Sequence, residues 1–258
     1  MKKIGSTPIK RCPDANLQIP PMKAMILAAG LGTRLKPWTE HHPKALAEVN
    51  GKSLLQHNIE YLQRYGITEV IVNVHHFAEQ IREAIETNRG WGTAITISDE
   101  TKEVLETGGG LKKAAWYFDE GDFVLMNVDV LTDMDLQAMI AYHNDHQPLA
   151  TLAVGNRATS RYFLFDELNE LCGWKNIQTG EEKQVRPAEN AVAMAFSGIH
   201  LVSPSIFSHI SQEGKFSMVD VYLELARRHR IKGFDHSGSA FIDVGKPESI
   251  AKAEQLFI

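Results

Sequence analysis

Cysteine is almost absent from this chain of 258 residues, which contains only Cys12 and Cys172. Two widely separated cysteines offer no metal-ligand spacing, and such low cysteine usage is typical of proteins from a reducing compartment. The sequence also lacks a run of about 18 apolar residues, the length that a membrane-spanning helix requires. Its first 21 residues are basic but contain no apolar core of the signal-peptide type. These absences predict a cytoplasmic protein that does not bind a membrane.

An excess of positive charge is missing as well. Lysine and arginine together number 27 against 32 acidic residues, so the formal net charge is −5. A chain without a broad positive field is not expected to bind nucleic acid, and any phosphate must be held by individual basic side chains. Hydrophobic residues make up 43% of the sequence, which is ordinary for a globular protein with one large domain or two small ones.

Strand-like and helix-like segments alternate over the first half of the chain. Apolar runs over residues 24–27, 69–74 and 122–128 predict strands, and the amphipathic segments between them predict helices. This alternation predicts an α/β fold, a Rossmann-like three-layer sandwich in which helices cover both faces of a mostly parallel sheet. Ligands in such folds collect beyond the carboxyl ends of the strands.

The pattern changes after Pro148. Residues 162–166 and 170–175 predict an antiparallel pair of strands, and the polar stretch over residues 181–190 predicts a loop. A long apolar run over residues 191–202 predicts a strand that returns to the sheet. We therefore predict a single domain over residues 22–258 with a small antiparallel insertion, a hairpin at about residues 156–190. The proline-rich residues 1–21 predict an irregular leader.

The most informative stretch follows the first apolar run and reads Ala28-Ala29-Gly30-Leu31-Gly32-Thr33-Arg34. A strand that ends in a loop of small residues exposes backbone N–H groups with few Cβ atoms in the way, which suits phosphate oxygens. Arg34 adds a planar fork of donors, and Lys44, which follows Pro43, adds a point charge. The stretch therefore predicts a loop that holds several phosphates at once.

Two common nucleotide-binding motifs are missing from the same stretch. A dinucleotide-binding fold would place a third glycine near Leu35, and a Walker loop would continue into Gly-Lys-Ser or Gly-Lys-Thr. Neither occurs. The sequence therefore disfavours both a nicotinamide-dependent oxidoreductase and a Walker-type phosphate loop.

Two aspartates follow apolar runs at distant positions. Asp129 comes after the run over residues 122–128, and Asp243 stands in Phe241-Ile242-Asp243-Val244-Gly245. Asp129 alone is also compatible with an ordinary capping or turn residue. If the two carboxylates meet beside the phosphate loop, they form a Mg²⁺ site, because this cation accepts one or two carboxylates and takes its other oxygens from phosphates and water.

A third stretch, Leu105-Glu106-Thr107-Gly108-Gly109-Gly110-Leu111, is compatible with two interpretations. It predicts either a helix capped by Thr107, with flexible glycines, or a backbone-lined loop that contacts a ligand. Lys175 is equally compatible with a phosphate contact and with an ordinary surface position. The residues alone leave these alternatives open.

The combination Ala-Ala-Gly-x-Gly-Thr-Arg with Pro43-Lys44 resembles the signature of the sugar-1-phosphate nucleotidyltransferases, also called nucleotide-sugar pyrophosphorylases. The resemblance extends from about Lys23 to the end of the chain, with the motifs in the family's order. It implies a nucleotide-diphospho-sugar transferase fold. It also implies an enzyme that condenses a nucleoside triphosphate with a sugar 1-phosphate to give a nucleotide sugar and pyrophosphate, with Mg²⁺ bound by Asp129 and Asp243.

The resemblance implies a role for residues of every motif. It makes Arg34 and Lys44 catalytic. The residues implied in nucleotide binding are Leu27, Ala28, Ala29, Gly30, Gly32, Thr33, Arg34, Lys44, Glu106, Thr107, Gly108 and Gly109. The residues implied in substrate binding are Asn127, Lys175, Ser197 and Gly198. Two of these depart from the family pattern, because Ser197 replaces a longer amide and Lys175 lies in Gly-Trp-Lys-Asn where many members have Glu-Lys-Pro.

The form Glu-Thr-Gly-Gly-Gly is similar to that of N-acetylmuramate-1-phosphate uridylyltransferases of peptidoglycan recycling. The resemblance therefore favours UTP with N-acetylmuramate 1-phosphate or a related hexose 1-phosphate, in the supply of the cell wall. The same chemistry with GTP and mannose or heptose 1-phosphate, or with CTP and phosphocholine, stays open. So does a non-catalytic regulator that binds nucleotide sugars, which would need the loop but no pair of aspartates. The sequence does not identify the oligomeric state, and a homo-oligomer stays open.

Overall fold

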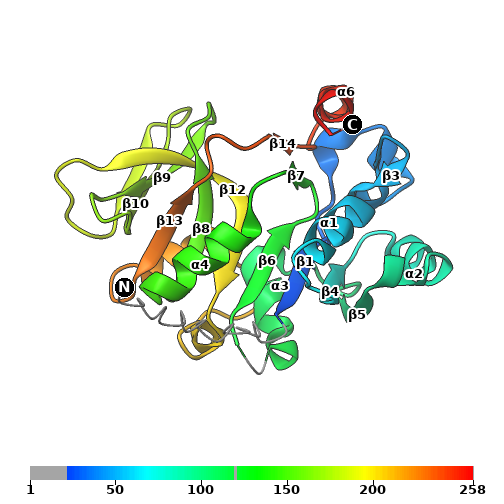
Figure 1. Cartoon of the computed structure of the whole chain (residues 1–258), viewed down its shortest axis with the longest axis horizontal. Coiled ribbons are helices and arrows are strands. Elements are labelled where there is room, and N and C mark those ends of the chain that lie inside the picture. The colour runs from blue at the N-terminus through cyan, green and yellow to red at the C-terminus, as the bar shows by residue number, and fades with distance from the viewer. Residues whose placement is uncertain (1–21, 119–120, 258) are drawn as a thin grey trace, which may run out of the picture.

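The computed structural model describes residues 22–118 and 121–257, so the leader predicted over residues 1–21 lies outside the described residues. The first half of the described chain forms parallel strands joined by helices (Figure 1). Strand β1 (Lys23–Leu27) pairs in parallel with β4 (Glu69–Val74) and with β6 (Phe123–Asn127), and β5 (Ala94–Asp99) pairs in parallel with β4. The crossovers contain the helices α1 (Leu54–Gln63), α2 (Ala78–Thr87) and α3 (Glu106–Lys113).

Helices cover both faces of these strands, as the burial of β1 shows. Ala24 and Ile26 belong to one apolar cluster, with residues of α1, α4 (Leu136–His146) and α6 (Pro247–Leu256). Met25 and Leu27 belong to a second cluster, with residues of α3 and α5 (Met218–Leu225). Because alternate side chains of a strand point to opposite faces, the two clusters lie on the two sides of one sheet. The predicted three-layer α/β sandwich with a mostly parallel sheet is confirmed.

The second half of the described chain extends this sheet beyond β6. Strand β12 (Val192–Val202) pairs antiparallel with β6 through its last residues and with β9 (Arg161–Phe165) through its first residues, as predicted for the returning strand. Strand β9 pairs antiparallel with β10 (Leu171–Asn176), which confirms the predicted pair. Strand β8 (Ala150–Gly155) pairs antiparallel with β12 and in parallel with β13 (Ile231–Asp235).

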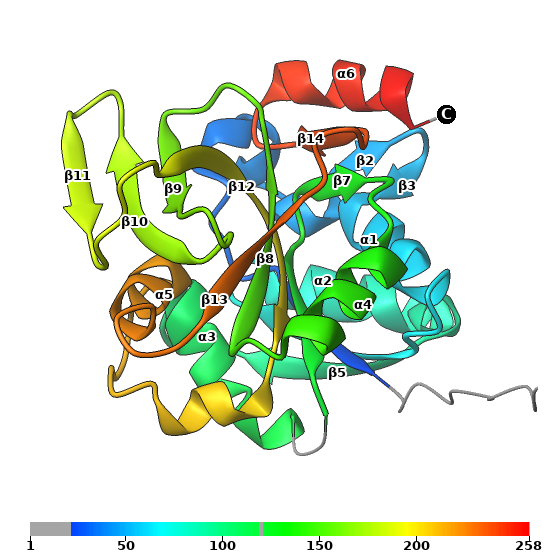
Figure 2. The same ribbon diagram turned by 60° about the vertical axis from the view of Figure 1, so that its left-hand side comes forward.

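One strand of this half differs from the prediction. Residues Glu181–Gln184, within the stretch expected to be a loop, form strand β11, which pairs antiparallel with β10 at the edge of the sheet (Figure 2). All of its side chains are exposed. The strand therefore lacks the alternation of apolar and polar residues by which a half-buried strand is recognised. It is held in the sheet by its backbone hydrogen bonds to β10 and not by burial of its side chains.

Short two-stranded pairs complete the described structure. Strand β7 (Val130–Thr132) pairs antiparallel with β14 (Phe241–Asp243), and β2 (Glu48–Val49) pairs with β3 (Lys52–Ser53). The pairing of β7 with β14 brings a late segment of the chain against the end of β6, and α6 lies over it (Figure 2). In the part of the chain that the structure describes, no helix has the length and apolar character needed to cross a membrane.

Several strands end at the same edge of the sheet. Strands β1, β4 and β6 run in parallel, and β8 runs with them because both β6 and β8 are antiparallel to β12. Strand β13 follows the direction of β8. The segments that leave these strands at their carboxyl ends therefore lie along one edge, where ligands of such sheets bind.

Candidate active site

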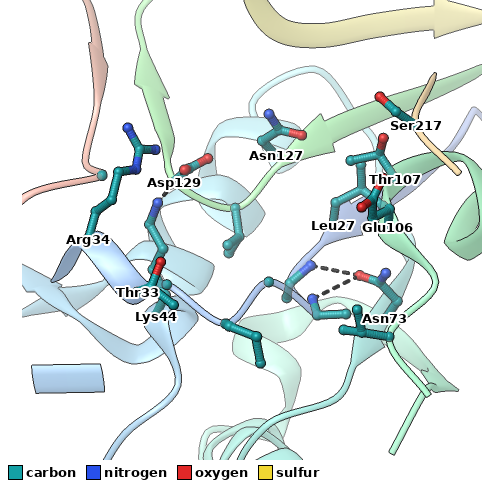
Figure 3. A pocket seen from close by; sticks show the side chains of 18 of the residues that line it. Leu27, Thr33, Arg34, Lys44, Asn73, Glu106, Thr107, Asn127, Asp129 and Ser217 are labelled. Carbon is teal, nitrogen blue, oxygen red and sulfur yellow. Dashed lines mark hydrogen bonds and ion pairs between the residues drawn. The ribbon is translucent and has the colours of Figure 1, made fainter. Parts of the chain in front are cut away.

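The glycine loop after β1 lies at this edge, and Asn73 fixes its beginning. The Oδ1 atom of Asn73 accepts hydrogen bonds from the backbone N–H groups of Ala28 at 2.7 Å and of Ala29 at 3.3 Å (Figure 3). Gly32 has a φ of +60°, and a Cβ atom there would lie 2.9 Å from Thr39 Cγ2, so the turn requires glycine. Among the described residues, no acceptor pairs with the N–H groups of residues 30–32, which can therefore bind an anion.

Lys44 and Asp129 form an ion pair beside the loop. The Nζ atom of Lys44 contacts Oδ2 of Asp129, and the lysine side chain is only 10% exposed (Figure 3). The residue before Asp129 is fixed by two hydrogen bonds, from Val128 N–H to Leu27 O at 3.2 Å and from Asn58 Nδ2 to Val128 O at 2.8 Å. The carboxylate predicted to bind a cation thus has a rigid backbone and already contacts a positive side chain.

Asp243 reaches Asp129 through the pairing of β7 with β14. Asp243 ends β14, and the N–H of the next residue, Val244, donates to the carbonyl of Asp129 at 2.8 Å. Burial raises the pKa of Asp243, and the negative charge of Asp129 raises it further. A Cβ atom on Gly245 would lie 2.5 Å from Asp243 Oδ1 and 2.9 Å from Arg34 Nη2, so this glycine lets the two side chains approach each other. The structure thus brings both predicted aspartates to the glycine loop.

The two aspartates fit a magnesium ion. Their oxygens are the hard ligands that Mg²⁺ prefers, and their mutual repulsion, which raises the pKa of Asp243, is relieved by a divalent cation. No group of three or more His, Cys, Asp or Glu side chains among the described residues could hold a metal ion by itself. The pair therefore suits a cation that takes its remaining oxygens from phosphate and water.

The glycine loop opens onto a cavity of about 510 Å³. Arg34 and Asp129 lie at one side of it, and Thr107 and Ser217 lie at the other side (Figure 3). The predicted site residues that line this cavity are Leu27, Ala28, Ala29, Gly30, Gly32, Thr33, Arg34, Lys44, Glu106, Thr107, Asn127 and Asp129. One continuous space therefore connects the groups predicted to bind phosphate with the beginning of α3.

Gly108 and Gly109, both implied in nucleotide binding, do not line the cavity. They lie inside α3, which begins at Glu106 and is not capped by Thr107. The hydroxyl of Thr107 instead accepts a hydrogen bond from the first N–H of α5 at 2.9 Å. The N–H of Gly108 donates to Phe216 O at 2.9 Å, and a side chain at either glycine would collide with the loop before α5. These glycines allow close packing of α3 on that loop.

The residues implied in substrate binding lie in different surroundings. Asn127 lines the cavity, and Gly198, with a φ of +71°, lies behind it, because a Cβ atom there would be 2.7 Å from Asn127 Nδ2. Ser197 is buried, and its Oγ forms a hydrogen bond of 2.7 Å with His236 Nε2. Lys175 is the last residue but one of β10, is paired with residues of β9 and β11, and does not line the cavity.

Asn73 and Glu100 are not among the predicted residues, although they support the glycine loop. Glu100 accepts hydrogen bonds from Asn73 Nδ2 at 2.7 Å and from Leu105 N–H at 3.1 Å, and burial raises the pKa of its carboxyl group. A Cβ atom on Gly110 would lie 2.7 Å from Glu100 Oε1, which explains the third glycine of α3. The sequence does contain a signal for Asn73, because it is an amide within the apolar strand 69–74. A buried amide needs hydrogen-bond partners, so such a residue is expected to hold a neighbouring segment in place.

Comparison with known proteins identifies relatives along nearly the whole chain. The family model of nucleotidyl transferases matches residues 23–257. The N-acetylmuramate alpha-1-phosphate uridylyltransferase of Caulobacter vibrioides is 31% identical over 240 residues, which cover 91% of this chain and 96% of that protein. The mannose-1-phosphate guanyltransferase of Yarrowia lipolytica is 29% identical over 241 residues, covering 92% of this chain and 64% of that protein. The crystal structure of HddC from Yersinia pseudotuberculosis, complexed with GMP-PN, has a TM-score of 0.72 at 23% identity and covers 92% of this chain and 100% of that chain.

The fold and these relatives define the class, a nucleotidyl transferase whose glycine loop lies at the carboxyl edge of an α/β sheet. Within this class, the chain belongs to the sugar-1-phosphate nucleotidyltransferase family, as its motifs predicted. It is therefore an enzyme that transfers a nucleotidyl group to a sugar 1-phosphate.

Proposed function

We propose that this enzyme condenses UTP with N-acetylmuramate 1-phosphate, or with a related hexose 1-phosphate, to give a UDP-sugar and pyrophosphate. The observation that carries the proposal is the convergence of Asp129 and Asp243 beside Arg34 and the glycine loop. A regulator that only binds nucleotide sugars would need the loop but not two aspartates of mutually repelling charge. The choice of uridine and N-acetylmuramate is supported by the Caulobacter relative, which matches over nearly its whole length.

The reaction joins two anions, so the protein must place them within bonding distance and neutralise their charge. An oxygen of the sugar phosphate attacks the α-phosphorus in line. A new P–O bond forms, the bond from the α-phosphorus to the bridging oxygen breaks, and pyrophosphate leaves with the electron pair. Because the attacking phosphate is itself a nucleophile, no general base is required. The amides of residues 30–33 and the guanidinium of Arg34 bind the departing pyrophosphate.

Asp129 and Asp243 hold Mg²⁺ in this proposal. When bound there, the ion would supply positive charge that offsets the repulsion between the two phosphates that react. Lys44 contacts the carboxylate of Asp129, so it balances that charge and has phosphate oxygens within reach once they are bound next to it. Glu106 and Thr107, across the cavity from Asp129, contact the nucleoside end of the triphosphate.

A second candidate is favoured by the Yarrowia relative, which is named a mannose-1-phosphate guanyltransferase. In this candidate the same groups bind GTP and mannose 1-phosphate or a heptose 1-phosphate. The first candidate stands ahead of it because its relative matches at higher identity and over 96% of that protein's length. In both candidates we place the reaction in the cytoplasm, and the first serves the supply of the cell wall.

A grid of four nucleoside triphosphates against several sugar 1-phosphates tests this proposal, with pyrophosphate release as the readout. We expect the highest kcat/KM with UTP and N-acetylmuramate 1-phosphate, and no release when EDTA replaces Mg²⁺. The highest kcat/KM with GTP and mannose 1-phosphate would select the second candidate. No release from any pair, together with retained binding of a UDP-sugar, would favour the regulator.

A further inference from the structure

Three polar side chains beyond Asp243 take no part in the reaction steps given above, although the resemblance implies Ser197 in substrate binding. Arg157 follows β8 and His236 follows β13, so both leave the sheet at the edge where the glycine loop lies. Ser197 lies in β12, in the stretch where the pairing of β12 with β8 is irregular. We call Arg157, Ser197 and His236 the acceptor-side cluster.

Arg157 is a half-buried cation with unused donors. Its guanidinium carbon lies 4.4 Å from the centroid of the Phe241 ring, and Nη2 donates to the carbonyl of Phe196. Its Nε atom is buried without a hydrogen-bond partner, and no carboxylate of the described residues lies within the 4.0 Å of an ion pair. Burial lowers the pKa of Arg157, which reflects the cost of removing the cation from water. A guanidinium offers five donors in a fork that fits two oxygens of one anion.

His236 adds a second unpaired atom at the same place. Its side chain is 7% exposed, and Nε2 forms a hydrogen bond with Ser197 Oγ, whereas Nδ1 has no partner. In the described part of the chain, Arg157 Nε and His236 Nδ1 are the two buried side-chain polar atoms without a partner. Burial and the charge of Arg157 lower the pKa of His236. Because buried polar atoms are nearly always paired, two unpaired ones together need partners that the described residues do not supply.

The acceptor-side cluster borders Asp243 through β14. Phe241 and Asp243 are two residues apart on this strand, so their side chains point to the same face. Arg157 lies over Phe241 and is therefore a neighbour of Asp243, whose charge acts on it. Arg34 approaches Asp243 at Gly245. The carboxylate of Asp243 thus has two guanidinium neighbours, Arg34 from the first half of the sheet and Arg157 from the second half.

We propose that Arg157, with His236 beside it, binds an anionic group of the sugar 1-phosphate. The inference rests on the proposed function and assigns the group that holds the acceptor. Arg34 then binds the triphosphate and Arg157 binds the acceptor, each next to Asp243. The anionic group is either the phosphate, which every acceptor carries, or a carboxylate on the sugar, which N-acetylmuramate carries and N-acetylglucosamine lacks.

The variant Arg157→Gln in the full chain tests this inference. N-acetylmuramate 1-phosphate and N-acetylglucosamine 1-phosphate are compared as substrates or, where one is not turned over, as competitive inhibitors. Loss of a hydrogen bond to a charged group should raise the acceptor KM about 10- to 100-fold and leave the KM for the triphosphate within about twofold of wild type. A rise with both acceptors identifies the phosphate as the bound group, and a rise with N-acetylmuramate 1-phosphate alone identifies the carboxylate. Arg161→Gln, which removes an exposed arginine at the start of β9, is the matched control.

An unchanged acceptor KM overturns the inference, and so does an equal rise in the KM of both substrates, because Arg157 would then act only by balancing Asp243. If Arg157→Gln is too unstable to assay, Arg157→Lys is used to test the inference instead, because lysine keeps the positive charge but lacks the planar fork of donors. A rise of about 3- to 10-fold in its acceptor KM supports the inference, and a wild-type value overturns it. Failure of the proposed function looks different, because the wild-type chain itself would then release no pyrophosphate with any acceptor.

Discussion

The two sides of the carboxyl edge are built in different ways. On the nucleotide side, the longest continuous stretch that lines the cavity is one loop, residues 28–34, whose backbone Asn73 and Glu100 hold in place. On the acceptor side, Arg157, Ser197 and His236 come from three separate segments and meet through side-chain contacts. The first side combines backbone amides with the side chains of Arg34 and Lys44, and the other side presents side chains from separate segments.

Because of this difference, the two sides should recognise their ligands in different ways. Backbone amides bind any phosphate, and their direction depends on the groups that hold the loop. Side chains from separate segments can be replaced one at a time, so the acceptor side can change with the sugar while the loop stays the same. Substitutions on the nucleotide side should therefore act on the KM of the triphosphate or on kcat, and substitutions on the acceptor side should act on the KM of the acceptor.

The largest effect is expected at Asp129, one of the two predicted metal ligands. Asp129→Ala should abolish pyrophosphate release at every Mg²⁺ concentration, because it removes a predicted metal ligand and leaves the buried Lys44 ammonium without its partner. Asp129→Asn keeps the shape of the side chain and should be equally inactive. The exposed Asp145→Ala serves as the control. Activity near that of the wild type for Asp129→Asn in Mg²⁺ would contradict the role of this residue as a ligand.

A smaller but still large effect is expected for Arg34→Ala. Loss of a donor that stabilises developing charge should lower kcat about 10²- to 10³-fold. The acceptor KM should change little, since Arg157 is assigned to that substrate. Steady-state kinetics with Lys36→Ala, an exposed neighbour, as the control would measure this. A defect confined to the acceptor KM would reverse the assignment of the two arginines.

The glycine loop is the part of this edge for which the sequence gives the clearest prediction. An apolar run followed by small residues defines both β1 and the loop within a single stretch, and the parallel order of the strands places Asp129 at the same edge. The convergence of Asp243 depends on β7, whose three residues are too few to show a pattern. The resemblance to a family, rather than spacing, therefore paired Asp243 with Asp129.

Several features of the structure depend on distant segments, which no window of the sequence contains. A run of glycines is typical of a ligand-binding loop, but Gly108 and Gly109 are required by Phe216 and its neighbours, far along the chain. Lys215 and Ser217 line the cavity from the loop before α5, and no local motif marks them. Strand β11 has no buried face at all. In each case the physical cause is a tertiary contact that a window of sequence does not contain.

The stability of the folded chain should also depend on pH, because β12 contains a buried histidine. His200 of β12 is buried, its Nδ1 forms a hydrogen bond of 2.6 Å with the hydroxyl of Tyr222, and burial lowers its pKa from 6.5 to about 3. Below pH 6.5 the unfolded chain binds a proton that the folded chain does not, so stability is lost as the pH falls from 6.5 towards 3. This group should lower the free energy of unfolding by about 2 kcal/mol between pH 7 and pH 5.

Urea unfolding at both pH values measures this loss. His200→Gln, whose side chain does not titrate, should lose about 2 kcal/mol less than the wild type over the same interval, whatever its stability at pH 7. Equal losses in the two proteins would show that the histidine does not stay neutral in the folded state.

The smallest effect is expected for Glu100→Gln, and it tests the comparison most directly. Glutamine has the same shape but only one acceptor oxygen, so it cannot accept hydrogen bonds from both Asn73 Nδ2 and Leu105 N–H. The loop amides then lose part of their fixed direction. Loss of one such bond, about 1 kcal/mol, should raise the triphosphate KM about 3- to 10-fold without changing the acceptor KM. The exposed Glu103→Gln is the matched control. A rise in the acceptor KM as well would show that the scaffold of the nucleotide side also positions the sugar phosphate, and the two sides would then act as one.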